Sequence, residues 1–202
     1  MVCTDARLAS IDNRLYNTSE GRNYIVTQFI PGLPKLMREC ALEKAGWRKL
    51  GDKDDRVYDI SELDLAAEKN NLYYRERWFK ENRSNIKDYE ERLIVTFSPK
   101  YALYQRQLRD EHIGKALRMI KNKSEKSRQT QQDPHRLIVT THCTTDGEVA
   151  EKSVMSLDTA AIEKERAMDG LNCLGTRLED SVGGNPSCQR VPLRDRTPVQ
   201  NH

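Results

Sequence analysis

The chain has 202 residues, of which 37% are hydrophobic and 32% are charged, and its formal net charge is +3. This length can bury one substantial core or two small ones, but the high proportion of charged residues indicates extended surfaces or disordered segments. The sequence has no apolar run near the roughly 18 residues of a membrane span and no basic-then-apolar leader. We therefore expect a cytoplasmic protein with no membrane partner.

The cysteines are odd in number and widely scattered. No Cys-x-x-Cys pair occurs, and the doublet His142-Cys143 has no partner pair at zinc-finger spacing. We interpret the cysteines as reduced thiols rather than as disulfide partners or zinc ligands. They are Cys3, Cys40, Cys143, Cys173 and Cys188.

The amino-terminal residues predict a strand that ends just before an acidic side chain. Residues 2–4 are mostly apolar, and residues 24–30 form a β-branched and aromatic stretch that predicts the next strand. Asp5 directly follows the first strand, and a polar segment expected to include a helix separates the two. Because ligands of open α/β sheets bind at the carboxyl ends of their strands, Asp5 is a candidate metal ligand. The alternative is that Asp5 caps the following helix.

Two prolines and a glycine interrupt the β pattern after the second strand. Apolar residues at helical spacing then predict a short amphipathic helix over residues 35–44, which Gly46 would end. Residues 51–70 are rich in Asp, Lys and Glu and predict exposed turns around a short strand at 57–60. Three further strands are predicted at 71–79, 90–97 and 136–142, and together they favour an antiparallel sheet.

The clearest helix of the sequence lies between these strands, over residues 99–122. Ser98 can cap it, and Pro99 suits its first turn. Its apolar residues recur every three, four or five positions and predict the buried face. They are Tyr101, Tyr104, Leu108, Ile113, Leu117 and Ile120.

The segment from Ser98 to Arg128 has nine basic and three acidic residues. Two interpretations of this charge stay open. One is an ordinary solvated helix face, and the other is a helix that contacts phosphates and binds DNA without reading its sequence. The candidate DNA-binding residues are Lys100, Arg106, Arg109, Lys115, Arg118 and Lys121.

A last helix is predicted over residues 159–168, because Asp158 can cap it and Gly170 can end it. Residues 171–176 then predict a strand that returns to the core.

Three long segments resemble bacterial insertion-sequence DDE transposases, in the branch with a β-rich insertion before the catalytic glutamate. They are VCTDARLASIDNRLYNTSEGRNYIVTQFIPGLPKLMRECAL, RLIVTFSPKYALYQRQLRDEHIGKAL and SLDTAAIEKERAMDGLNCLGTRLED, and they cover most of residues 1–180. The resemblance matches Asp5 to the second catalytic aspartate. It implies two Mg²⁺ ions and phosphodiester cleavage and strand transfer on DNA during transposition. Arg7 stands where the family usually has glycine, which places a long side chain beside the metal ligand.

The resemblance also implies the fold class, which is α/β: a partial ribonuclease H-like core with an inserted antiparallel β-rich domain. Residues 1–30 would belong to the core and residues 31–168 to the insertion domain, which contains the basic helix. Residues 169–180 would return to the core, and residues 181–202 would form a tail.

The tail changes character from Gly183, with three prolines, no aromatic residue and no apolar periodicity. It is either a disordered terminus or out-of-frame translation. Read one base later, the codons can encode Glu-Glu-Ile-Leu-His-Val-Ser-Glu and then Glu-Ile-Glu, which resembles the helix carrying the family's catalytic glutamate. The family's first aspartate lies on an earlier strand. We therefore expect a truncated chain that keeps Asp5 alone of three carboxylates.

One carboxylate supplies one or two oxygen ligands, whereas Mg²⁺ requires near-octahedral coordination. The first expectation is therefore a transposase fragment that is inactive alone. The second is a non-catalytic DNA-binding or regulatory fragment that binds DNA or pairs with an intact transposase. The third is a gene remnant without function, with the strands at 2–4 and 24–30 left as unpaired edges.

Overall fold

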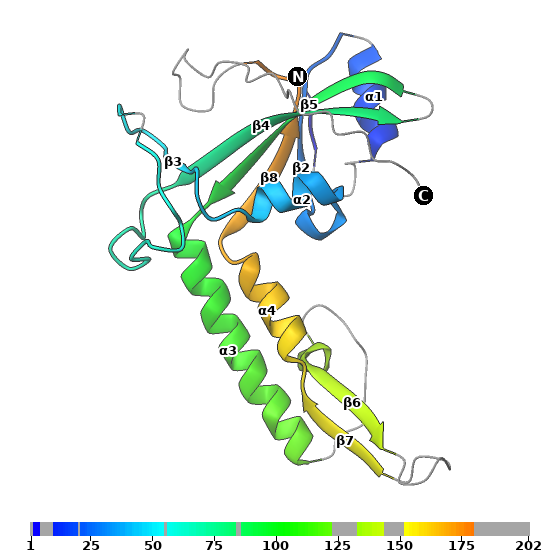
Figure 1. Cartoon of the computed structure of the whole chain (residues 1–202), viewed down its shortest axis with the longest axis vertical. Helices are drawn as coiled ribbons and strands as arrows, with labels where there is room; N and C mark the ends of the chain where they lie inside the picture. The colour runs from blue at the N-terminus through cyan, green and yellow to red at the C-terminus, as the bar shows by residue number, and fades with distance from the viewer. Residues whose placement is uncertain are drawn as a thin grey trace, which may run out of the picture.

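The computed structural model describes residues 2–4, 10–19, 21–54, 56–83, 86–122, 133–143 and 152–179. Within these ranges the fold is mixed α/β, with a six-stranded sheet, a two-stranded sheet and four α-helices. Figure 1 shows the larger sheet at one end of the molecule and two helices that extend from it toward the smaller sheet.

The six-stranded sheet has the order β1-β2-β8-β5-β4-β3. Its strands are β1 (Val2–Thr4), β2 (Tyr24–Gln28), β3 (Arg48–Lys49), β4 (Tyr73–Arg83), β5 (Ile86–Phe97) and β8 (Leu171–Thr176). β1 and β2 are parallel, and all other neighbours are antiparallel. Helix α1 (Ile11–Ser19) connects β1 to β2 along the chain, as a parallel pair requires.

The last strand in sequence, β8, lies in the middle of this sheet. Gly175 is opposite Val26 of β2 on one side and opposite Leu93 of β5 on the other. The strand predicted over residues 171–176 is confirmed, and it pairs with β2. The expectation that 24–30 forms an unpaired edge is wrong for β2, because both β1 and β8 pair with it.

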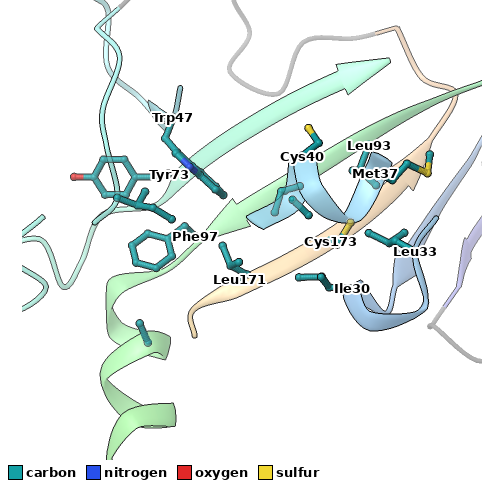
Figure 2. Packing of buried hydrophobic residues seen from close by; sticks show 14 of the residues in the cluster. Ile30, Leu33, Met37, Cys40, Trp47, Tyr73, Leu93, Phe97, Leu171 and Cys173 are labelled. Carbon is teal, nitrogen blue, oxygen red and sulfur yellow. The ribbon is translucent and has the colours of Figure 1, made fainter. Parts of the chain in front are cut away.

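One face of this sheet carries the main hydrophobic core, shown in Figure 2. The 3-10 turn η2 (Ile30–Gly32) and helix α2 (Lys35–Leu42) cover it with Ile30, Met37 and Cys40. Trp47 is fully buried, and its ring meets Phe97 edge-on at 6.1 Å. Alternate residues of β5 point to the same face, as strand geometry requires, and the sheet contributes Tyr73, Phe79, Leu93, Val95, Phe97, Leu171 and Cys173.

The two extended helices are α3 (Pro99–Lys121) and α4 (Thr159–Ala167). The 3-10 turn η3 (Pro134–Leu137) and the hairpin of β6 (Ile138–Cys143) and β7 (Lys152–Leu157) lie beyond α4 and alongside the far half of α3. We call these elements the arm. A second, small hydrophobic cluster fills the arm, around the buried residues Ala116, Leu137 and Ile162.

Local signals in the sequence place these elements well. Ser98 Oγ accepts a hydrogen bond from Tyr101 N, and Asp158 Oδ1 accepts one from Ala161 N, so both predicted caps are confirmed. The predicted antiparallel pairing of 71–79 with 90–97 is confirmed as β4 with β5. The strand predicted at 136–142 pairs with β7 instead of joining them. The strand predicted at 57–60 is reduced to one bridge, between Tyr58 and Trp47.

The predicted buried face of α3 is wrong for most of its residues, although Ile113 packs against the small cluster of the arm. Tyr101, Tyr104, Leu108 and Leu117 are exposed, and the buried residues are Pro99, Ala102, Arg109, His112 and Ala116. Alanines on the inner face let neighbouring elements approach closely, and a paired charge can be buried beside them. Hydrophobic periodicity detects neither effect. None of the helices in the described residues is both long and apolar enough to cross a bilayer.

We predict that Gly170→Ala strongly destabilises the fold. Gly170 joins α4 to β8 with φ of +75°, and an added Cβ would lie 2.8 Å from both Ser98 O and Phe97 Cε2. Backbone strain and overpacking together should cost about 2–4 kcal/mol in the free energy of unfolding, measured by urea titration.

Gly114→Ala is the matched control for this change. Gly114 lies within α3, and nothing within 4 Å would contact its added Cβ. This variant should be more stable by about 0.5–1 kcal/mol. Equal urea midpoints for the two variants would contradict the predicted role of Gly170.

Candidate functional site

Asp5, the candidate metal ligand, lies outside the described residues, as does Arg7. The described strand β1 ends at Thr4, directly before Asp5. Among the described residues no group of three or more His, Cys, Asp or Glu side chains could hold a metal ion. The magnesium implied by the resemblance therefore stays a prediction about Asp5, and we derive no catalytic step from it.

The candidate DNA-binding residues all lie on α3, but the structure separates them. Lys100, Lys115, Arg118 and Lys121 are exposed. Arg106 has a side chain that is 53% exposed, with Nε 3.6 Å from Asp169 Oδ2. Arg109 is buried, so five of the six basic side chains reach solvent.

Arg109 forms a buried ion pair with Asp169, which lies just after α4. Its two terminal nitrogens each donate a 2.6 Å hydrogen bond to one oxygen of Asp169, and both side chains are buried. These hydrogen bonds raise the pKa of Arg109. Because its guanidinium is paired with Asp169 on both terminal nitrogens and its side chain is only 5% exposed, Arg109 fixes α3 to the turn after α4 and is not placed to contact phosphate.

Helical spacing divides the exposed side chains of α3 into two groups. With 3.6 residues per turn, Lys100 and Arg118 are five turns apart on the same side, and Tyr104 and Lys115 are about three turns apart. This side, which we call the tyrosine face, consists of Lys100, Tyr101, Tyr104, Leu108, Lys115 and Arg118, and Glu111 lies among them. Arg106 and Lys121 lie outside the tyrosine face.

Sequence reasoning placed the two tyrosines in the core, and the structure exposes them. Tyr101 is 41% exposed and Tyr104 is 58% exposed. Their rings stack, with centroids 6.2 Å apart and an angle of 19° between the ring planes. The spacing of seven residues between Ala102, Arg109 and Ala116 marks the opposite, buried side of α3.

A second polar cluster lies under α1 and was not predicted. Glu91 of β5 is 2% exposed, and its carboxylate accepts hydrogen bonds from Tyr24 Oη at 2.9 Å and Gln28 Nε2 at 3.1 Å. Arg14 of α1 forms an ion pair with the same carboxylate, and the hydroxyls of Tyr24 and Tyr89 are hydrogen bonded. Burial, followed by the charge of Glu91, raises the pKa of Tyr24. This cluster joins α1 and β2 to β5.

Polar contacts also join the distal parts of the arm. Arg136 of η3 donates to Glu165 of α4 at 2.7 Å, and its Nη2 lies 3.1 Å from His112 Nδ1 of α3. Burial and the nearby charges of Arg136 and Lys115 lower the pKa of His112. Through this contact His112 joins α3 to η3.

Comparisons with protein-family models, curated proteins and solved structures found no match for this chain. Membership of the transposase family therefore remains a prediction that rests on the resemblance of the three segments.

We predict that Asp169→Leu destabilises the arm by about 3–5 kcal/mol, because it leaves the charge of Arg109 buried without a partner. Adding Arg109→Met should recover most of this loss, since it removes the buried charge. The measurement is the free energy of unfolding from urea titration.

Asp110→Leu is the control, because Asp110 is the exposed neighbour of Arg109 on the same helix. It should change stability by no more than about 0.5 kcal/mol. If the single Asp169 variant and the double variant unfolded at the same urea concentration, the buried pair would not be the cause of the loss.

Proposed function

We propose that the chain is a DDE transposase fragment, related by descent to Mg²⁺-dependent DNA cleavage and strand transfer and inactive by itself. The observation that supports this is the connection between the first strands and the rest of the sheet. A parallel β1-α1-β2 unit, with Asp5 directly after β1, is joined to the antiparallel strands β8, β5 and β4. This is the arrangement expected of a partial ribonuclease H-like core with a β-rich insertion whose last strand returns.

The proposed lack of activity follows from the number of carboxylates. The resemblance matches one residue, Asp5, to the three metal ligands of the family. Two-metal catalysis needs several carboxylates that hold two ions about 3.5–4 Å apart. Asp5 can donate one or two oxygens to Mg²⁺, so the residue that the resemblance matches does not by itself complete a two-metal site.

The nucleotide sequence of the gene and its flanks tests this proposal. Translation in all frames should give an upstream strand that ends in Asp, and a frame shifted by one base after residue 182 that encodes a Glu-Ile-Glu helix. Absence of both would contradict the proposed descent from a transposase. An upstream Asp without the shifted frame would contradict the frameshift, and the shifted frame without an upstream Asp would contradict the predicted first aspartate.

A second candidate function is sequence-independent DNA binding by α3. The observation in its favour is that five basic side chains of this helix are exposed, whereas the buried one is neutralised by Asp169. Exposed Lys and Arg side chains bind phosphates and release counterions. Pairing with an intact transposase stays a prediction without a described contact to support it.

We predict that replacing Lys115 and Arg118 together by alanine weakens binding to duplex DNA. The slope of log K against log salt should fall by about 1.8, because each lost phosphate contact contributes about 0.9. Fluorescence anisotropy of a labelled duplex, titrated between about 50 and 200 mM salt, measures this slope.

Lys35→Ala is the matched control, since Lys35 lies on α2 and its side chain is 82% exposed. Its loss should leave the salt slope unchanged. Wild-type binding that did not weaken over this salt range would rule out phosphate contacts as the cause of binding.

A further inference from the structure

The tyrosine face of α3 combines exposed aromatic rings with positive charge. Tyr101 and Tyr104 are stacked on each other, and Leu108, one turn further along the helix, is 38% exposed. Among the described residues η3 and α4 pack against the other side of α3, where His112 contacts Arg136 and Ala116 lies in the cluster with Leu137 and Ile162. Aromatic and aliphatic surface gathered on one helix face indicates a binding surface.

The charges of this face specify the chemistry of its ligand. Lys100 precedes the tyrosines, and Lys115 and Arg118 follow them on the same side of the helix. Glu111 is the one acidic residue on that side, and it accepts a 3.4 Å hydrogen bond from Gln107. The face is therefore complementary to an anionic ligand. A second copy of the same face would bring three cations and a single acid, which is a poor match in charge.

The aromatic part of the face distinguishes single strands from duplexes. In a duplex the flat faces of the bases are already stacked on one another, so tyrosine rings gain little from contact with it. An unpaired base offers its π face, and proteins that bind single strands combine such stacking with a positively charged track. The face from Lys100 to Arg118 is about 27 Å long, at 1.5 Å per residue, which is long enough to follow several nucleotides.

We propose that the tyrosine face binds single-stranded nucleic acid, with unpaired bases stacked on Tyr101 and Tyr104 and phosphates held by Lys100, Lys115 and Arg118. This inference rests on the DNA-binding function proposed for α3 and narrows its ligand from any phosphate backbone to unpaired strands.

The test uses the full chain and three labelled probes of equal length, about 16 nucleotides each. They are oligothymidylate, an abasic strand with the same number of phosphates, and a duplex. Anisotropy titrations at one salt concentration should show that oligothymidylate binds at least about tenfold more tightly than the abasic strand and the duplex.

Variants then locate the stacking. Tyr101→Ser and Tyr104→Ser should each weaken oligothymidylate binding at least about fivefold and leave binding of the abasic strand unchanged. Tyr104→Phe keeps the ring and should retain the affinity. Tyr16→Ser is the matched control, because Tyr16 of α1 is 63% exposed and lies outside α3. These are surface changes, and circular dichroism verifies that each variant is folded.

Other results would overturn the inference in distinguishable ways. Equal affinity for oligothymidylate and the abasic strand, or unchanged binding by both serine variants, would show that bases do not stack on this face. Duplex binding without a preference for single strands would overturn this inference and leave the DNA-binding function standing. No binding of any probe would overturn both. Self-association that rises with protein concentration and disappears in Tyr104→Ser, without oligonucleotide binding, would assign the face to a second copy.

Discussion

Backbone pairing of β8 between β2 and β5 is the constraint on which the rest of the structure depends. It joins the parallel β1-α1-β2 unit to the β4-β5 hairpin. Gly175 makes the position workable, because an added Cβ there would lie 2.1 Å from Gln28 Nε2 and 2.5 Å from Glu91 Oε1. Without a side chain on β8 at this point, the carboxylate of Glu91 can reach Tyr24 and Gln28 on β2. A glycine thus allows a buried charge to be satisfied across an intervening strand.

The pairing of β8 with β5 also determines where the helices of the arm leave the sheet. β5 continues into α3 through Ser98, and α4 continues into β8 through Gly170, so the two helices leave the sheet from neighbouring strands. The corner is closed by hydrogen bonds from Ser98 N to Gly170 O and from Gly170 N to Gln105 Oε1. Asp169 is adjacent to this corner, which is why Arg109 on α3 can reach it. The pairing of β5 with β8 and the corner between Ser98 and Gly170 therefore determine which side of α3 faces α4.

The sequence predicts those parts of the fold that depend on neighbouring residues. Caps at Ser98 and Asp158, the helix after Pro34 and the strands on either side of residues 84–85 all follow from local chemistry. The place of β8 in the sheet and the cluster around Glu91 depend on residues more than 60 positions apart, for which a single sequence carries no local signal. The hairpin strand β7 was not predicted, because its residues have no clear alternation.

The candidate site shows why counting charged and apolar residues misassigns a helix. Arg109 adds to the positive charge of α3 in the sequence, but its charge is compensated by Asp169 inside the protein. Tyr101 and Tyr104 add to the apolar count, but their rings are exposed because the alanines and the paired arginine occupy the inner side. The composition of α3 therefore does not indicate which of its side chains are buried and which are exposed. What the helix can bind follows from which side its partners leave open, and that side carries aromatic rings together with cations.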